Sequence, residues 1–176
     1  MKTYIAFLRG INVSGQRKIK MAILRGSIEK IGFKNVQTYI QSGNIVFISK
    51  ADSKAEIREQ LENCIEKKFG FDIPVLVLEK EVVTDILKKY PFKDAESKNQ
   101  YFTLLYSPAT ETLVRTFTKL KFKTEDYLIT ERCVYLNCKA GAGKAKLNNN
   151  LIEKKLEVIA TTRNLRTMQQ MLELAN

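Results

Sequence analysis

Two glycine-containing loops in this sequence carry residue types that suit binding of an anion. The first runs Leu8-Arg9-Gly10-Ile11-Asn12 and then Ser14-Gly15-Gln16-Arg17-Lys18, between a predicted strand and a predicted helix. Glycine lets the backbone approach a ligand closely, and the start of a helix offers free N–H groups, so both features favour an anion. The spacing from Gly10 to Gly15 fits neither the dinucleotide fingerprint nor the phosphate loop. A flexible, solvated connection explains the same residues equally well.

The second loop, Gly141-Ala142-Gly143-Lys144-Ala145-Lys146, is similar to the end of a phosphate loop. It departs from that motif at two places, because Cys138 replaces the first glycine and Ala145 replaces the magnesium-binding Ser or Thr. A glycine loop with Lys144 and Lys146 at a predicted helix start remains. The alternatives are a generic anion site and a solvated loop.

Two shorter segments also contain candidate functional residues. Gln41-Ser42-Gly43-Asn44 has the composition of a hairpin turn, and Ser42 as a nucleophile would need a lysine or carboxylate base. Thr161-Thr162-Arg163-Asn164 is predicted to open the last helix, with Thr162 as its cap. Arg163 and Arg166 would oppose the helix dipole there, and an anion between them would offset that cost.

The amino-acid composition excludes several classes of catalytic and metal site. The chain has no histidine, which removes histidine triads, histidine general bases and nearly all common zinc and iron ligand sets. Cys133 and Cys138 lie five residues apart in a predicted strand, on opposite faces, and are poorly placed to share a zinc ion. We therefore predict no metal and no cofactor. An odd count of three cysteines and the absence of an export signal predict reduced thiols in the cytoplasm.

The net charge of +11 is concentrated at the two ends of the chain. Residues 1–50 hold nine basic and one acidic side chain, residues 51–135 hold fourteen and fifteen, and residues 136–176 hold seven and three. This distribution favours an anionic partner, although solubility alone also explains it. No stretch approaches the length of about 20 apolar residues that a membrane helix needs, so no membrane partner is predicted.

Hydrophobic periodicity predicts the same order of elements twice. In the first half, strands are expected over 3–8, 36–40, 45–48 and 73–78, and helices over 21–31 and 54–69. Ser53-Lys54-Ala55-Glu56 is a capping box before the second helix, and Gly70 ends it. A further helix is expected over 82–90. In the second half, strands are expected over 101–106, 127–130, 133–137 and 158–160, and helices over 113–120, 145–156 and 165–175.

The repeated strand, helix, strand, strand, helix, strand order predicts an α+β fold of two ferredoxin-like (βαββαβ) lobes with extra helices, including a C-terminal helix. The predicted boundaries are 1–90 for the first lobe, 91–100 for a linker and 101–176 for the second lobe. In this topology, loop 9–20 and turn 41–44 lie at the same edge of the first lobe. Segments 139–146 and 161–164 are expected to share one edge of the second. The strand aromatics Tyr4, Tyr39, Phe47, Tyr101 and Tyr135 offer either a sheet face that stacks single-stranded RNA or, for most of them, core packing.

Four segments together resemble the bacterial family called domain of unknown function 1697: residues 8–13, 41–44, 146–147 and 160–164. The sequence departs from the usual family pattern at Ser14, Ala145 and Leu165, where glycine, serine and tryptophan are usual. The resemblance implies a compact α/β fold with ferredoxin-like parts and implies no activity.

Three classes of function stay open. The first is an anion-binding protein, with nucleic acid as the favoured partner. The second is an enzyme acting on a small phosphorylated or carboxylated ligand, and the third is a protein-interaction module. The candidate ligand-binding residues form two clusters, one from each lobe: Arg9, Asn12, Arg17, Lys18, Ser42 and Asn44, and then Lys144, Lys146, Arg163 and Asn164.

Overall fold

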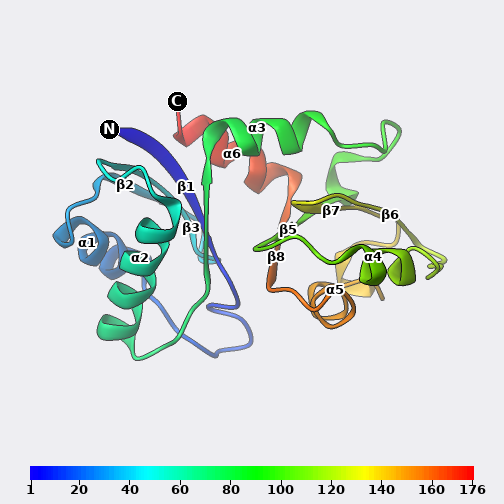
Figure 1. The fold of residues 1–176 in the computed structure, drawn as a ribbon, viewed down its shortest axis with the longest axis horizontal. Helices are drawn as coiled ribbons and strands as arrows, with labels where there is room; N and C mark the ends of the chain where they lie inside the picture. The colour runs from blue at the N-terminus through cyan, green and yellow to red at the C-terminus, as the bar shows by residue number, and fades with distance from the viewer. The chain divides into compact units, whose positions relative to one another are not determined.

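A computed structural model describes all residues from 1 to 176 and divides them into two compact units (Figure 1). The first comprises Met1–Asp85 with Gln169–Asn176, and the second comprises Ile86–Met168. Each unit holds a four-stranded antiparallel sheet in the strand, helix, strand, strand, helix, strand order. The predicted α+β fold of two ferredoxin-like lobes is confirmed. The predicted boundaries at 90 and 100 stay a prediction, and the structure groups the last eight residues with the first unit.

The first unit is built from four strands and two helices of one βαββαβ repeat. In chain order they are β1 (Lys2–Leu8), α1 (Met21–Lys30), β2 (Lys34–Tyr39), β3 (Asn44–Ser49), α2 (Lys54–Phe69) and β4 (Val75–Glu79). The sheet order is β2-β3-β1-β4, so the first and third strands lie at the centre. Both helices lie on the same side of the sheet (Figure 1).

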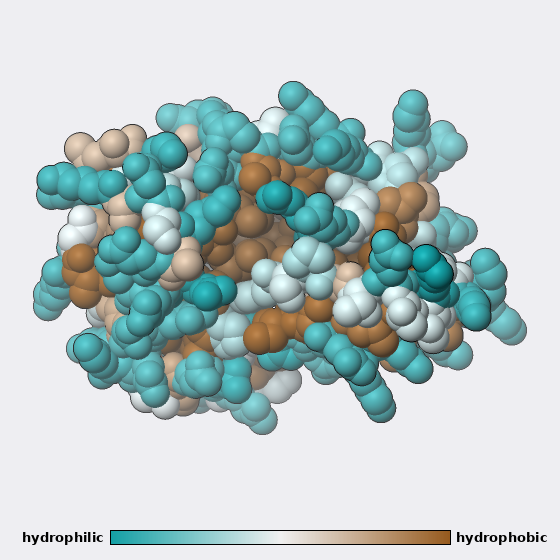
Figure 2. Space-filling view, in the orientation of Figure 1, coloured by the Kyte–Doolittle hydropathy of each residue, from teal (hydrophilic) through white to brown (hydrophobic).

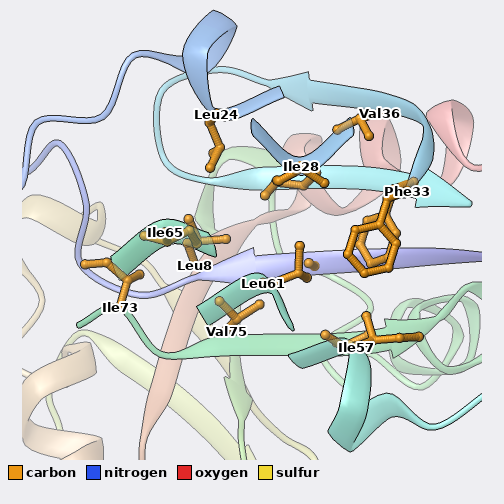
Figure 3. Close-up of a cluster of buried hydrophobic side chains, with 14 of the residues drawn as sticks. Leu8, Leu24, Ile28, Phe33, Val36, Ile57, Leu61, Ile65, Ile73 and Val75 are labelled. Carbon is orange, nitrogen blue, oxygen red and sulfur yellow. The ribbon is translucent and has the colours of Figure 1, made fainter. Parts of the chain in front are cut away.

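The core of the first unit forms where the two helical stripes meet one face of the sheet (Figure 3). Leu24 and Ile28 of α1 are fully buried, as is the stripe of α2 that includes Leu61 and Ile65. Because side chains alternate along a strand, β1 sends every second residue, ending at Leu8, into this core. Burial of each large apolar side chain stabilises the folded state by roughly 1.5–3 kcal/mol. The loop after Leu8 therefore starts from a firmly anchored strand end.

The second unit repeats the arrangement with β5 (Gln100–Leu105), α4 (Glu111–Phe117), β6 (Glu125–Ile129), β7 (Cys133–Cys138), α5 (Asn149–Leu156) and β8 (Ala160–Asn164). Its sheet order is β6-β7-β5-β8, which matches the first unit strand for strand. The core packs Phe117 of α4 and Ile152 of α5 against alternate residues of β7, among them Leu136. Two 3-10 turns, η1 (Ser97–Asn99) and η2 (Ala142–Lys144), lie in the loops before β5 and before α5.

Two helices lie outside the repeats, α3 (Lys80–Lys88) and α6 (Leu165–Leu174). Within the first unit, the Lys80 ammonium donates a hydrogen bond to the side-chain oxygen of Asn176 at the end of the chain. Every helix in the protein is too short or too polar to cross a lipid bilayer.

The local signals at α2 act as the sequence predicts. The Ser53 hydroxyl accepts a hydrogen bond from the Glu56 backbone N–H at 3.3 Å, which satisfies one of the free donors at the helix start. Gly70 follows the helix with φ of +72°, the left-handed conformation that glycine adopts at little cost. Helix α2 therefore spans the predicted residues.

The prediction for the last strand and the last helix cap is wrong. The strand is β8, Ala160–Asn164, and not residues 158–160. Thr162 lies inside this strand, and its hydroxyl is 2.8 Å from that of Thr103 on β5. The cap of α6 is Asn164, whose side-chain oxygen accepts from the Thr167 backbone N–H at 2.9 Å. Pairing with β5 extends the strand through both threonines, and a local capping motif contains no information about that partner.

The helix predicted over 145–156 starts later, at Asn149. Its cap is Asn148, whose side-chain oxygen accepts from the Leu151 backbone N–H at 3.0 Å. Lys144 and Lys146 consequently lie on the connection before α5 and not in its first turn.

Candidate functional site

The loop after β1 and the turn between β2 and β3 meet, as the topology predicts. The Leu8 backbone N–H donates to the Gly43 carbonyl at 2.8 Å, and the Asn12 side-chain amide donates to the Gln41 carbonyl at 2.7 Å. Gly43 is required at this approach, because a Cβ there would lie 2.5 Å from the Leu8 Cβ and its φ is +75°. The two segments thus form one hydrogen-bonded edge of the first unit.

The two asparagines predicted to bind a ligand hold this edge together. Asn12 exchanges hydrogen bonds with both backbone groups of Ile19, at 2.9 and 3.0 Å, besides its bond to Gln41. Asn44 is fully buried, and its amide donates at 3.0 Å to the Tyr39 carbonyl and to the Ser42 hydroxyl. These amides have a structural use in shaping the loop.

The charged tip of the loop faces solvent. We call Arg17, Lys18 and Lys20 the basic loop: all three are exposed, and none forms an ion pair. Arg17 lies over Gly10, where a Cβ would be 3.7 Å from its guanidinium. Helix α1, which begins after Lys20, has no side-chain cap and no acidic residue in its first turn. Arg9 is half-buried behind this tip, with its backbone N–H bonded to the Pro74 carbonyl.

In the second unit, the four predicted residues have different environments. Lys144 and Lys146 are exposed on the loop between β7 and α5. Arg163 is buried in β8, where its guanidinium donates to the Thr161 hydroxyl at 2.8 Å and to the Thr162 carbonyl at 2.9 Å. Burial lowers the pKa of Arg163 to about 10, so the group is still cationic at neutral pH. Asn164 caps α6, as described above.

Three further lysines lie next to this loop, and the sequence analysis did not identify them. They are on the connection between α4 and β6, and two hydrogen bonds join this connection and the first residue of β6 to the loop before α5. The Lys139 backbone N–H donates to the Thr124 carbonyl at 2.9 Å, and the Lys146 backbone N–H donates to a Glu125 carboxylate oxygen at 2.5 Å. We name the exposed group the lysine surface, and its members are Lys119, Lys121, Lys123, Lys144 and Lys146.

None of the five side chains of the lysine surface forms an ion pair. The buried carboxylate of Glu125 is already occupied by backbone and by the Thr124 hydroxyl, at 3.0 Å. Nearby Asp126 is paired with Lys139 at 2.8 Å. In Figure 2, the region where Figure 1 places α4 and β6 has teal hydrophilic side chains interspersed with white and brown ones. The sequence feature that indicates this surface is the alternation Lys-Leu-Lys-Phe-Lys at 119–123. It is not apparent from net charge, because basic and acidic residues nearly balance over residues 51–135.

Aromatic side chains line a shallow pocket beside Lys121. The pocket has a volume of about 340 Å³, and Phe122 and Tyr127 contribute to its wall. The Tyr127 hydroxyl donates to the carbonyls of Phe117 and Leu120, at 2.8 and 2.9 Å, which fixes the lysine-bearing connection. The rings of Phe122 and Tyr127 meet edge to face with centroids 5.8 Å apart.

Core packing accounts for three of the five strand aromatics, whereas Tyr39 and Tyr101 are half-buried. Tyr4 and Phe47 are fully buried and stacked on each other, and Tyr135 is 2% exposed. No group of three or more cysteine, aspartate or glutamate side chains is arranged to hold a metal ion.

The fold and these surfaces define a basic α+β protein of two ferredoxin-like lobes. Residues 1–135 match the model of the family described as "Protein of unknown function (DUF1697)", and the chain belongs to that family. The resemblance drawn from the four sequence segments is thereby confirmed. A solved structure of a conserved bacterial protein from Streptococcus pneumoniae is also similar, with 25% identity and a TM-score of 0.76, over 99% of this chain and 98% of that one. No curated protein matches the chain.

Proposed function

We propose that the protein binds nucleic acid, with the lysine surface of the second unit contacting the phosphate backbone. The observation that supports this proposal is the gathering of five exposed, unpaired lysines on two connections, which one backbone hydrogen bond and the Glu125 carboxylate hold together. Lysine neutralises phosphates as a point charge and releases condensed counterions, which is the main source of affinity in sequence-independent binding.

An extended polyanion fits this surface better than a small phosphorylated metabolite. A site for a small anion concentrates several donors on one buried point, whereas these ammonium groups stand in solvent along two connections. The first unit separately has exposed charges of its own on the basic loop, Arg17, Lys18 and Lys20.

Single-stranded nucleic acid is the favoured form. Proteins that bind single strands combine a basic track for the backbone with aromatic rings on which unpaired bases stack. Phe122 is half-buried between Lys121 and Lys123, beside the 340 Å³ pocket, and is positioned to contribute such a ring. Base-paired DNA would use the lysines alone.

The test is a fluorescence-anisotropy titration of labelled single-stranded RNA and duplex DNA against the wild type and a triple variant, Lys119→Ala, Lys121→Ala and Lys123→Ala. The matched control removes the same charge from exposed positions of α1 and α2, with Lys30→Ala, Lys67→Ala and Lys68→Ala. We expect the first variant to lose most of the affinity and the control to keep it. Equal losses in both variants would show that net charge alone attracts the ligand, and no binding by the wild type would refute the proposal.

A further inference from the structure

A second pocket in the second unit has unused hydrogen-bonding capacity. It has a volume of about 670 Å³, within the usual range for small-molecule sites. Segment 91–96 forms one side, and Asn99, Asp126, Asn137 and Lys139 line the rest. None of the five lysines of the lysine surface lines it.

The side chains at the floor of this pocket come from adjacent strands. In the register of the sheet, Asn137 of β7 is directly opposite Asp126 of β6, so the two share one face. Asp126 accepts a hydrogen bond from the Asn137 amide nitrogen at 3.0 Å and from the Lys139 ammonium at 2.8 Å. Both carboxylate oxygens of Asp126 are therefore occupied.

This arrangement fixes the orientation of the Asn137 side chain. The reverse orientation would place the amide oxygen, which only accepts hydrogen bonds, against the acidic oxygen of Asp126. In the observed orientation, Oδ1 of Asn137 is buried and has no hydrogen-bond partner in the protein. The residue as a whole is 8% exposed. A buried acceptor without a donor is rare in native proteins and costs free energy, which a bound donor would recover.

A second amide and an aromatic ring complete the pocket. Asn99 is 7% exposed and forms no side-chain hydrogen bond, so its amide also has both a donor and an acceptor to offer. Phe92 lines the pocket, and its ring meets Tyr90 edge to face with centroids 5.6 Å apart, which holds it in place.

The charges around the pocket balance one another. Lys139 is paired with Asp126, and Glu96 is paired with Lys98 at 2.8 Å. Lys93 and Asp94, adjacent in the chain, have opposite charges. The pocket therefore has no excess charge with which to select an anion or a cation.

We propose that this pocket binds a small, neutral, planar molecule of the amide or nucleobase type. Its N–H group donates to Oδ1 of Asn137, its neighbouring acceptor takes a hydrogen bond from the amide of Asn99, and its flat face packs on Phe92. Each of these contacts uses a group that the protein itself leaves unsatisfied or half-covered.

Adenosine, cytidine, guanosine, uridine and nicotinamide are suitable uncharged probes. Each is titrated to millimolar concentration into the full-length protein at moderate salt while amide resonances are followed by nuclear magnetic resonance. We expect at least one probe to bind with saturable shifts in the side-chain NH₂ signals of Asn99 and Asn137. The nearly isosteric Asn137→Leu variant should weaken that binding at least tenfold. The control Asn150→Leu, at an exposed asparagine of α5 outside the pocket, should leave it unchanged.

Three outcomes would overturn the proposal. The first is that none of the probes shifts these signals, and the second is that Asn137→Leu binds as tightly as the wild type. The third is that adenosine monophosphate binds at least tenfold more tightly than adenosine, because the site would then recognise phosphate. If Asn137→Leu fails to fold, Phe92→Ala takes its place, and the wild-type shifts alone still decide whether the pocket is occupied.

Discussion

The salt dependence of nucleic-acid binding should report the number of lysines that contact phosphate. If all five residues of the lysine surface neutralise phosphates of a single strand, the logarithm of the association constant should fall with log salt at a slope of about −3.5. Between 50 and 200 mM salt, affinity should then drop by about 130-fold. In the triple variant Lys119→Ala, Lys121→Ala and Lys123→Ala, two contacts remain, the slope should be about −1.4, and the same change in salt should weaken binding by only about sevenfold.

The assay is anisotropy of a labelled single-stranded RNA at four or more salt concentrations, with both variants and the wild type measured in parallel. The α1 and α2 control variant has the same net charge as the triple variant and should keep the wild-type slope. A triple variant whose slope equals that of the wild type would refute the assignment of phosphate contacts to this surface, even if its affinity at one salt concentration is lower.

Three further predictions concern the structure around the candidate sites. Gly43→Ala should lower the free energy of unfolding, measured by urea denaturation, by about 2–4 kcal/mol, because it adds a clash with Leu8 to a left-handed φ. Gly15→Ala has the same φ of +75° but open space around it, so it should lower the free energy of unfolding by only about 1 kcal/mol. Equal losses in the two variants would contradict this account. Asn12→Ala removes three hydrogen bonds and should cost about 2–3 kcal/mol in the same assay, so a negligible loss would show that the loop does not depend on them. Burial raises the pKa of the Cys138 thiol to about 11. The rate of alkylation of this residue in the native protein, followed by mass spectrometry, should therefore rise about tenfold per pH unit from about pH 8 to about pH 10. A plateau in that interval would be inconsistent with the raised pKa.

The elements that sequence periodicity placed correctly are those whose determinants are local. The α2 helix carries its own start and stop signals in Ser53 and Gly70, and its buried stripe recurs at helical spacing. The turn sequence at Gly43 predicts the hairpin that β2 and β3 form. Such features depend on residues within a few positions of one another, so the sequence alone contains the required information.

The β8 strand shows where local information ends. Thr162 and Asn164 both have the chemistry of a helix cap, and only pairing with β5 decides that the threonine extends the strand and the asparagine caps α6. The side-chain roles of Asn12 and Arg163 were missed for a related reason. A polar residue on a loop or strand can face solvent or satisfy buried backbone, and its neighbours in space make that choice.

The amino-acid sequence by itself determined the two-lobed α+β fold, the basic ends of the chain and the exclusion of histidine chemistry, because composition and hydrophobic period express these directly. Only the tertiary structure brought the lysines of 119–123 beside Lys144 and Lys146, since that surface depends on the pairing of β6 with β7, in which Glu125 faces Cys138. The unpartnered oxygen of Asn137 likewise exists only because strand register places Asp126 against the other end of its amide. Such surfaces and pockets form where strands from distant segments pair. Because the free energy of strand pairing is spread over whole strands, no local sequence motif indicates which strands will pair.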